Sequence, residues 1–467
     1  MNKKLWSLIF IFSVLRALVA VQTDLGVDEA HYALYGLFPD LSYFDHPPLI
    51  GWIQIPFSFL ADHGFGSWRW MARLPVLCAG ALATVLTYQW LRLKSFTQEQ
   101  ALWGVMALNL CLLYEGIAVF ILPDSLFLIL VPALAISVEH LENAKTYKNW
   151  LRLGLVLGLC GLSKYTAILF VVALALRWTL QRSLRDLLSN AFWSGVFLAG
   201  LLTLPVIIWN LQHDWLSFKY QSGHVMNWEN LSIKDFAVSQ LSQLFLLGFF
   251  YPWLLKSLVQ EKSWSFERIF ILVCLGFMSL SAAFGNFLPH WTAPAFILGV
   301  PWAIALSLQK DYFTRSLKTA FLGASLLFAG INSELIFHWL PAKQSKYLYR
   351  DIQGWPDYIQ GLSQMADQRN QKLAVTNWTF GSRFMLYAKS RENIFVLDQR
   401  IDQFDLWNPA SPPHQDFLIA VEPEHSQEFQ KQIQCSELSS DGVKPLLWRE
   451  TELISFEILN CKNFNWK

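Results

Sequence analysis

Acidic residues follow the first long apolar segment of the chain. Residues 5–21 are long and apolar enough to cross a bilayer, and Asp28 and Glu29 come shortly after them. Asp45 and His46 follow in the same loop, so three carboxylates and one histidine gather where the chain leaves the membrane. Carboxylates at a membrane surface are either solvated by water or take part in binding or catalysis. This concentration suggests a polar reaction site that is supplied from the lipid phase.

The pair Asp28-Glu29 has two interpretations. It is either the acidic flank of a membrane helix, which is ordinary on the side that carries few cations, or a general base with a neighbour that orients it. A general base must reach the proton of the attacking hydroxyl within hydrogen-bonding distance. We expect Asp28 to take this catalytic role and Glu29 to assist it.

The segment from Tyr43 to Pro48 forms the second cluster. Pro47 restricts His46 to an extended conformation, and two consecutive prolines stiffen the chain. A rigid turn that presents an acid and a titratable cation is suited to holding a phosphate. Tyr43, Asp45 and His46 are therefore candidate substrate-binding residues. The alternative is an ordinary proline-rich loop between two interfacial helices.

Further polar residues stand at the ends of apolar runs on the same predicted side. Asp124 is a candidate N-cap of the next helix and a candidate third catalytic carboxylate in the same cavity as Asp28, and the two roles are compatible. Lys164 divides two apolar stretches, where it either snorkels to the surface or contacts a lipid phosphate. His213 and His290 lie in outer loops and are candidate substrate-binding residues, although loop polarity alone also explains them. The histidine spacing shows no zinc signature.

The composition is typical of a polytopic membrane protein. Of the 467 residues, 54% are hydrophobic and only 15% are charged, well below the ~25% of soluble domains. The many tryptophan and phenylalanine residues fit membrane–water interfaces. The net charge of +1 gives no indication of nucleic-acid binding, and the six cysteines form no metal-ligand spacing.

We predict a mainly α-helical membrane bundle of about eleven spans, because a spanning helix needs ~20 mostly apolar residues. The candidate spans are residues 5–22, 70–92, 100–118, 124–140, 150–164, 165–181, 190–210, 237–256, 268–286, 291–308 and 319–339. Lysines and arginines gather on the side of the N-terminus, which the positive-inside rule places in the cytoplasm. The first apolar segment resembles a signal peptide but lacks a clear cleavage site, so we interpret it as an uncleaved helix.

Two domains follow from this pattern. Residues 1–340 form the transmembrane module, with its first outer loop at 24–69, and residues 341–467 form a small α/β domain on the outer face. In the first loop, residues 49–60 are too short to span and are predicted to lie in the interface. The tail is expected to contain strands at 372–376, 394–397 and 416–421 and helices at 382–388 and 424–434. Cys435 and Cys461 either form a disulfide in an oxidising compartment or remain two free thiols.

An ordered set of motifs resembles membrane glycosyltransferases of the GT-C type, and most closely the bacterial family 39 enzymes related to protein O-mannosyltransferases and lipid A aminoarabinose transferases. The resemblance covers about residues 1–310. Its motifs are Val27-Asp28-Glu29-Ala30-His31-Tyr32, Tyr43-Phe44-Asp45-His46-Pro47-Pro48-Leu49, Arg73-Leu74-Pro75, Pro123-Asp124-Ser125, Leu162-Ser163-Lys164-Tyr165-Thr166, Pro205-Val206-Ile207-Ile208-Trp209-Asn210, His213-Asp214-Trp215 and Pro289-His290-Trp291-Thr292-Ala293-Pro294-Ala295. The tail segment from Asp398 to Trp407 is similar to the tails of some bacterial members.

The resemblance implies a transferase that takes a sugar from a polyprenyl-phosphate donor on the outer face, with inversion at the sugar carbon. Asp28 would be the catalytic carboxylate, Asp45 and Asp124 would line the same site, and Lys164 would contact the donor phosphate. His46 replaces the residue that relatives place before the proline pair, which leaves its phosphate contact open. A divalent metal is possible, because some enzymes of this type use one, but no ligand cluster in the sequence demands it.

We therefore predict a glycosyltransferase of the inner membrane whose acceptor is a lipid, such as lipid A, or a glycan or a protein. A transporter or flippase for a lipid-linked sugar is the alternative, and it predicts paired ionisable residues within the membrane and two related halves. A glycan polymerase or ligase on another fold and an inactive lipid-binding relative are further alternatives. The sequence does not identify the sugar, the acceptor or the oligomeric state.

Overall fold

The computed structural model divides the chain into two compact units, each built from segments that are distant in the sequence. The bundle unit contains residues 1–19, 40–50 and 73–333, and the tail unit contains residues 20–39, 51–72 and 334–467. The first outer loop is therefore shared: Asp28 lies in the tail unit, whereas Asp45 lies in the bundle unit. The structure describes all residues except 1–2, 182–183, 226–230, 286–287, 311–313 and 408–413.

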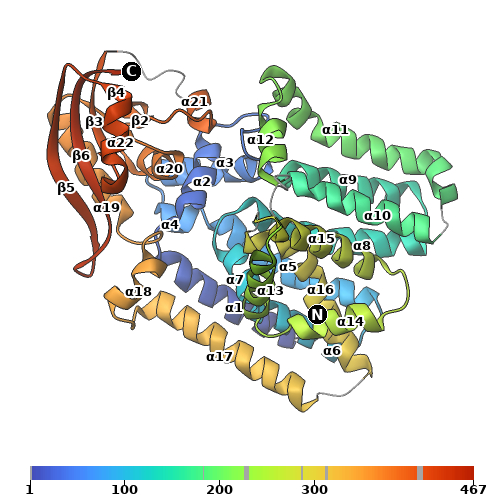
Figure 1. Cartoon of the computed structure of the whole chain (residues 1–467). Helices are drawn as coiled ribbons and strands as arrows, with labels where there is room; N and C mark the ends of the chain where they lie inside the picture. Colours follow the sequence, from blue (N-terminus) through green and yellow to red (C-terminus); the bar gives the residue numbers. More distant parts are fainter. Residues whose placement is uncertain (1–2, 182–183, 226–230, 286–287, 311–313, 408–413) are drawn as a thin grey trace. The chain divides into compact units, whose positions relative to one another are not determined.

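The bundle unit consists of helices (Figure 1). They are α1 Lys3–Gln22, α5 Leu74–Leu93, α6 Gln98–Leu110, α7 Leu112–Val119, α8 Phe127–Asn143, α9 Tyr147–Ser163, α10 Ile168–Leu180, α11 Asn190–Gln212, α12 Leu216–Val225, α13 Ile233–Leu246, α14 Tyr251–Gln260, α15 Phe266–Ala283, α16 Ala293–Lys310 and α17 Arg315–Phe337. Short 3-10 turns precede α8 (Pro123–Leu126), α10 (Tyr165–Ala167), α11 (Leu184–Leu188) and α16 (Pro289–Thr292). Within the described residues, every segment that the sequence predicted to span contains one of these helices or a pair of them.

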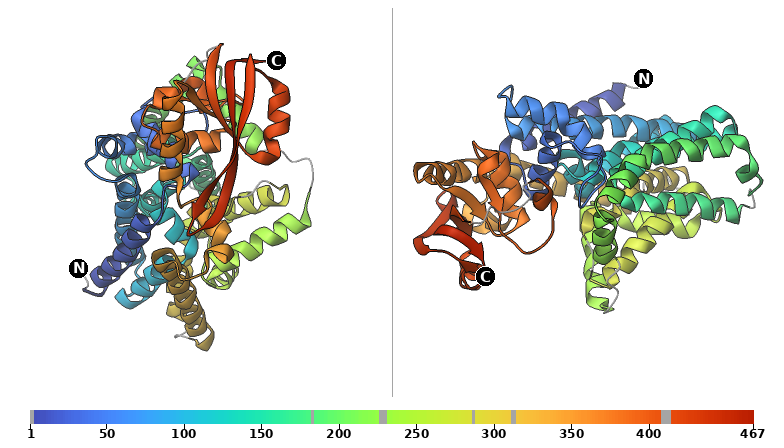
Figure 2. Two further views of the ribbon diagram at one scale, coloured as in Figure 1. Left: turned by 90° about the vertical axis from the view of Figure 1, so that its left-hand side faces the viewer. Right: turned by 90° about the horizontal axis from the view of Figure 1, so that it is seen from above.

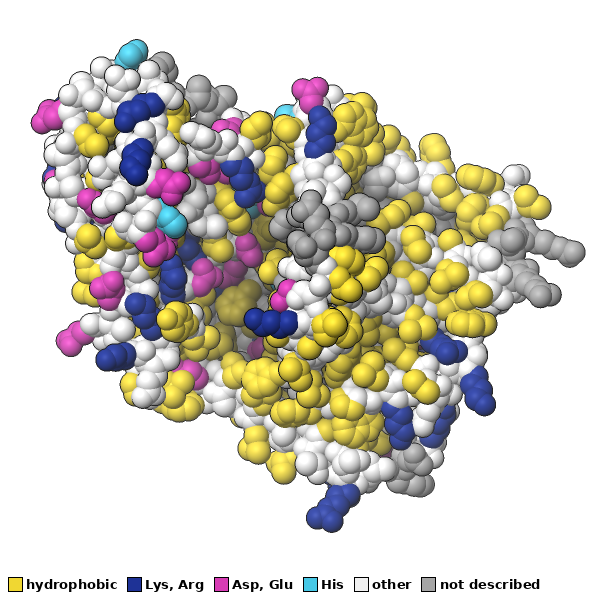
Figure 3. Space-filling model, in the orientation of Figure 1, with side chains coloured by type: hydrophobic (Ala, Val, Ile, Leu, Met, Phe, Trp, Pro, Cys, Tyr) yellow, Lys and Arg dark blue, Asp and Glu magenta, His cyan; other side chains and the backbone are white. Residues whose placement is uncertain are grey.

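The chain is a multi-pass membrane protein. Within the described residues, seven helices are long and apolar enough to cross a bilayer, or up to nine if each of two bent pairs counts as one span. The other two predicted spans are the shorter helices α9 and α10. The described residues therefore hold seven to nine candidate spans of sufficient length, where the sequence predicted about eleven. Figure 3 shows hydrophobic side chains spread over the bundle unit, while charged side chains are mixed over the surface of the tail unit.

A buried ion pair connects α1 with the first bent pair, α6 and α7, which meet at 71°. Arg16 Nε lies 2.8 Å from Glu115 Oε2, and Arg16 Nη2 donates to Asn109 Oδ1 at 3.0 Å. The guanidinium also lies over the rings of Phe12 and Tyr114. The arginine that interrupts the first apolar segment is therefore 1% exposed and neutralised inside the bundle.

The tail unit combines helices with one mixed sheet (Figure 2). Its helices are α2 Val27–Leu37, α3 Leu49–Asp62, α4 Trp68–Met71, α18 Ala342–Tyr349, α19 Trp355–Gln368, α20 Trp378–Tyr387, α21 Gln403–Trp407 and α22 Pro423–Gln432. Its strands are β1 Lys372–Val375, β2 Ile394–Val396, β3 Gln415–Val421, β4 Ile433–Gln434, β5 Glu437–Trp448 and β6 Thr451–Trp466. The three predicted strands are confirmed as β1, β2 and β3.

The central strands of the sheet are covered on both faces, whereas β5 is mostly exposed. Its order is β2-β1-β3-β6-β4, with β5 paired to β6, and the β1 pairs with β2 and β3 are parallel whereas the β6 pairs are antiparallel. On one face, Phe417 and Ile419 share a core with Phe429 of α22. On the other face, Phe456 contacts Phe380 of α20 and Trp355 of α19. The predicted helix 424–434 ends at Gln432, because its last two residues form β4 beside β6.

Cys435 and Cys461 form a disulfide, which decides between the two alternatives that the sequence left open. The bond joins the segment after β4 to the middle of β6 across 26 residues of sequence. Closing a loop of this length in the unfolded chain stabilises the folded state by about 3 kcal/mol in the chain-entropy description. Disulfides persist in oxidising compartments, such as the outer compartment that the predicted topology gives the tail.

Thiol labelling of the denatured full-length protein tests this bond. We expect four alkylated cysteines without a reductant and six with one, because Cys78, Cys111, Cys160 and Cys274 are free. The variant Cys461→Ser releases the thiol of Cys435 and should give five under both conditions. Six alkylated cysteines in the unreduced wild-type protein would contradict the bond.

Candidate functional site

The two members of the acidic pair lie in different environments at the start of α2. Glu29 is 3% exposed, and its Oε2 accepts a hydrogen bond from the Gly26 amide at 2.9 Å. A carboxylate in the first turn of a helix satisfies a free amide in this way. Glu29 therefore caps α2, while Asp28 is half-buried. The catalytic role of either residue stays a prediction.

A third carboxylate, Asp24, precedes this helix in the tail unit. Its Oδ1 lies 2.5 Å from Arg69 Nη2, and its own amide donates to the carbonyl of Ile352 at 2.8 Å. Burial raises the pKa of Asp24 and outweighs the opposing effect of the Arg69 guanidinium. Asp24 and Glu29 are thus set in a charged, largely desolvated environment, whereas Asp28 is half-buried.

The tail segment that the sequence likened to bacterial relatives packs on α2. The Trp407 ring lies 5.8 Å from His31 and is stacked on Phe38 at 5.1 Å, measured between ring centroids. Burial raises the pKa of Asp402 to about 7, and it raises the pKa of Asp398 to about 6. This segment therefore provides carboxyl groups that exchange protons near neutral pH.

In the bundle unit, the loop at residues 40–48 is tied to α11 and α12. Trp209 Nε1 donates to Asp40 Oδ2 at 2.9 Å, and Gln221 Nε2 donates to the Asp45 carbonyl at 2.6 Å. The Tyr43 hydroxyl is buried and accepts a hydrogen bond from the Asp40 amide at 3.2 Å, and burial raises its pKa. Tyr43 therefore stabilises the turn, and Asp45 and His46 remain half-buried.

A second polar centre of the bundle unit joins the predicted residues Asp124, Lys164 and His290. Lys164 Nζ lies 2.6 Å from Asp124 Oδ2, and His290 Nε2 lies 3.8 Å from the same oxygen. Asp124 is 1% exposed and Lys164 is 6% exposed. Trp291 adds an aromatic face 5.9 Å from the ammonium. The structure thus brings together three predicted residues that are far apart in sequence.

The backbone explains why this pair forms. Pro123 starts a 3-10 turn after the extended residue Leu122, and α9 ends at Ser163 so that Lys164 is extended. Ser163 Oγ donates to the Pro123 carbonyl at 2.9 Å and locks the two chain breaks together. Leu122, and not the Asp124 side chain, occupies the cap position. The lysine reaches a buried acid instead of snorkelling to water.

Tyr165 is a residue of this region that sequence reasoning missed. Its hydroxyl lies 2.6 Å from Ser217 Oγ, it also interacts with Ser42 and Asn210, and the Asp45 carboxylate acts on it electrostatically. Tyr165 therefore connects the break after Lys164 with the loop at 40–48. Its position directly after the lysine in a quoted motif was the available signal.

His213 has a structural environment. Its Nδ1 lies 2.8 Å from the Trp209 carbonyl, and its ring is stacked on that of Trp209 at 4.0 Å. The histidine closes the C-terminal end of α11, at the tryptophan that binds Asp40. Its predicted contact with substrate stays a prediction.

One group of possible metal ligands occurs among the described residues, namely Glu422, Glu424 and His425. It lies on the partly exposed start of α22 and includes none of the predicted site residues. The expectation that Asp28 shares a cavity with Asp124 joins residues of different units and stays a prediction.

A double-mutant experiment tests the buried pair of Lys164 and Asp124. We expect Lys164→Gln and Asp124→Asn each to lower the free energy of unfolding by about 3 to 5 kcal/mol, because each leaves one buried charge without its partner. The double variant, which has two neutral hydrogen-bonding groups, should recover most of this loss. Thermal unfolding of the detergent-solubilised proteins measures all three. Additive losses in the double variant would show that the two side chains do not interact.

The chain is similar in sequence to known proteins. Residues 45–209 match the family model of dolichyl-phosphate-mannose-protein mannosyltransferase. The chain is 27% identical over 305 residues to the lipid A galacturonosyltransferase RgtD of Rhizobium johnstonii, and the match covers 62% of each protein.

Solved structures of ArnT from Cupriavidus metallidurans have the same fold. The structure bound to undecaprenyl phosphate matches with a TM-score of 0.66 at 13% identity, over 98% of each chain. The apo structure matches with a TM-score of 0.65 at 13% identity, over 97% of each chain. The chain therefore has the fold of ArnT, and the predicted resemblance to membrane glycosyltransferases of the GT-C type is confirmed.

Proposed function

We propose that this protein is a membrane glycosyltransferase that moves a sugar from a polyprenyl-phosphate donor to a lipid acceptor of the lipid A type. The reaction takes place at the outer face of the inner membrane and inverts the sugar carbon. The names of RgtD and of the undecaprenyl phosphate complex of ArnT suggest the acceptor and the donor. One feature of the bundle unit carries the proposal.

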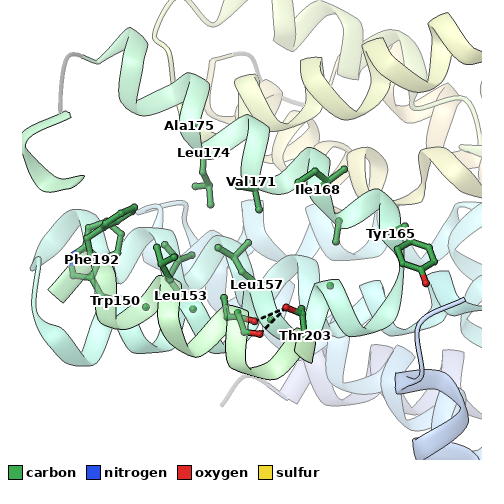
Figure 4. Close-up of a pocket in the computed structure, with 18 of the residues that line it drawn as sticks. Trp150, Leu153, Leu157, Tyr165, Ile168, Val171, Leu174, Ala175, Phe192 and Thr203 are labelled. Carbon is green, nitrogen blue, oxygen red and sulfur yellow. Dashed lines mark hydrogen bonds between the residues drawn. The ribbon is translucent and has the colours of Figure 1, made fainter. Parts of the chain in front are cut away.

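That feature is an apolar groove of about 640 Å³ along α9, α10 and α11. Figure 4 shows Tyr165 at one end and Trp150 and Phe192 at the other, with aliphatic side chains between them. The 14 residues of α9 from Trp150 to Ser163 measure ~21 Å along the helix axis. A groove of this length accommodates a large part of a chain that crosses a ~30 Å hydrocarbon layer.

Glycines set the spacing of the helices along this groove. A Cβ atom on Gly154 would lie 2.1 Å from the Gly195 carbonyl oxygen, and one on Gly161 would lie 2.8 Å from the Thr203 methyl. Small residues let membrane helices approach closely. Since α9 and α11 touch here, α10 is left to form the other wall, and the space between them suits a flexible hydrocarbon chain.

The polar end of the groove suits a phosphate. Lys164 and Tyr165 line the groove at this end. A cation placed where the leaving phosphate gains charge stabilises the transition state. Asp124 holds the lysine in place and His290 lies beside it. We assign the donor phosphate to Lys164, with the hydroxyl of Tyr165 as a further hydrogen-bonding group.

We assign the catalytic carboxylate to Asp28 of the tail unit, with Asp124 assisting through Lys164. Glu29 is buried as the cap of α2, whereas Asp28 is half-buried and retains access to a substrate. The role of Asp28 is to activate the acceptor hydroxyl or, for a phosphate acceptor, to orient it and stabilise charge on the sugar ring. Asp45 and His46 are assigned to substrate binding in the same reaction.

The transporter alternative is weaker. It predicts paired ionisable residues within the membrane, and Arg16 with Glu115 is such a pair. These side chains are, however, 1% and 9% exposed, and Asn109 and aromatic rings surround the arginine. A pair enclosed in this way stabilises helix packing and offers no path to a solute.

A bulky side chain in the groove tests the donor site. In Ala175→Trp, the indole occupies the wall of the groove, and we expect the KM for undecaprenyl-phosphate sugar to rise at least tenfold. Losing contact with two methylene groups already costs about 1.6 kcal/mol. Ala329→Trp, on the exposed face of α17, is the matched control and should behave as wild type. Transfer of labelled sugar in proteoliposomes measures both.

The length of the donor chain sharpens this test. A donor with a prenyl chain too short to reach Ala175 should show the same KM with wild-type protein and with Ala175→Trp. If the KM for the full-length donor is also the same with wild-type protein and with Ala175→Trp, the groove does not bind the donor chain.

Replacement of the proposed catalytic carboxylate is a separate test. We expect Asp28→Asn to lower kcat by about 10² to 10⁴-fold, the usual loss for a general base. Asp357→Asn removes an exposed carboxylate from the first turn of α19 and is the matched control. The measurement is sugar transfer with a panel of polyprenyl-phosphate sugars at equal amounts of folded protein. Equal rates for Asp28→Asn and wild type would exclude Asp28 from catalysis.

A further inference from the structure

Helix α20 of the tail packs along α2 through a series of specific contacts. The Leu25 amide donates to the Tyr387 hydroxyl at 3.2 Å. At the other end, His31 Nδ1 lies 3.2 Å from Ser382 Oγ, and the His31 ring lies 5.4 Å from that of Trp378. Trp378 and Ser382 are spaced by four and share one face of α20. With Tyr387 near the other end, α20 follows α2 from the residue before its cap to its second turn.

The second hydrogen bond of Ser382 shows which group is the donor in its contact with His31. Its Oγ donates to the Trp378 carbonyl at 3.0 Å, so it accepts the hydrogen bond from His31 Nδ1. His31 is 3% exposed and surrounded by aromatic rings. The histidine is thus an anchor of α2 in the tail and is not available to a substrate.

Arg383, the neighbour of Ser382, is a buried cation of α20. It is 3% exposed, its guanidinium forms an ion pair with Asp351, and it lies 4.2 Å from the centroid of the Trp355 ring. Burial lowers the pKa of Arg383 to about 10, and the negative charges of Asp28 and other nearby acids oppose this shift. The cation is therefore fixed in orientation and acts on the first turn of α2.

The cap of α2 shows how closely this arrangement fits. A Cβ atom on Gly26 would lie 2.6 Å from Asp351 Oδ2, so the carboxylate that Arg383 holds is packed against the cap residue. Gly26 has φ −65°, which any residue adopts, and the glycine is required here only for space. Asp28 is two residues further along the chain.

We propose that Arg383 is a positioning residue for catalysis: through Asp351 and Gly26 it fixes the first turn of α2 and so orients the carboxylate of Asp28, on which its positive charge also acts. The inference rests on the proposed function, in which Asp28 is the catalytic carboxylate. It gives the tail a specific task, which is to hold the helix that carries this residue.

The test compares kcat, KM and the pH dependence of sugar transfer in the full-length protein. We expect Arg383→Met to lower kcat by about 10- to 100-fold, the range for a small misplacement of a reacting group. The KM for the donor should change less than threefold, on the order of one hydrogen bond. Loss of the cation makes ionisation of Asp28 less favourable, so the acid limb of the pH profile should move to higher pH. Partial unfolding would instead lower the rate equally at every pH.

Two further variants separate positioning from folding. Arg383→Lys keeps the charge but loses the planar fork, and it should retain the wild-type acid limb with an intermediate kcat. Gly26→Ala displaces Asp351 while Arg383 stays in place, and it should lower kcat without moving the acid limb. Arg369→Met, which removes a partly exposed arginine paired with Asp441, is the matched control and should match wild type within twofold.

The outcomes distinguish this inference from the proposed function. If wild type transfers sugar, Asp28→Asn does not, and Arg383→Met retains the wild-type kcat and acid limb, only the positioning role is wrong. If Arg383→Met does not fold, a wild-type kcat in both Arg383→Lys and Gly26→Ala likewise overturns the role. If wild type transfers sugar and Asp28→Asn is equally active, the assigned carboxylate is wrong and the inference falls with it.

Discussion

Every charge within the apolar bundle needs an opposite charge beside it, and this constraint shapes the bundle unit. An ionised side chain without a partner is very costly in a medium that cannot solvate it. Arg16 is therefore placed against Glu115, and Lys164 against Asp124, each at hydrogen-bonding distance. Both pairs lie at interruptions of helices, where the backbone leaves polar groups that also need partners.

The interruptions of the helices position the polar residues of the candidate site. The break between α6 and α7 turns the chain by 71°, and Glu115 binds α7 to α1 through Arg16. Phe120 then packs under the guanidinium of Arg73, and the chain enters the turn that carries Asp124. A second break after α9 extends Lys164 toward that turn. The candidate site of the bundle unit is thus formed by helix ends and not by helix faces.

The tail unit positions its carboxylates differently, by covering a helix on several sides. The central strands of its sheet are buried on both faces, and α20 lies between the sheet and α2, with Phe380 and Phe384 on Phe456 and Ser382 on His31. A short helix such as α2 has little stability of its own, so its geometry depends on these contacts. The acidic motif of the first loop is therefore part of the folding unit that contains the tail.

The sequence by itself determined the apolar helices, the first three tail strands and the identities of the polar residues, because hydropathy and alternation are local properties. Alternation in residues 455–458 also signals β6. Only the tertiary structure decided the partners. Arg16 meets Glu115 across 99 residues, Lys164 meets Asp124 across 40, and His31 meets Ser382 across 351. Such pairs depend on how helices pack, and no local pattern encodes that distance.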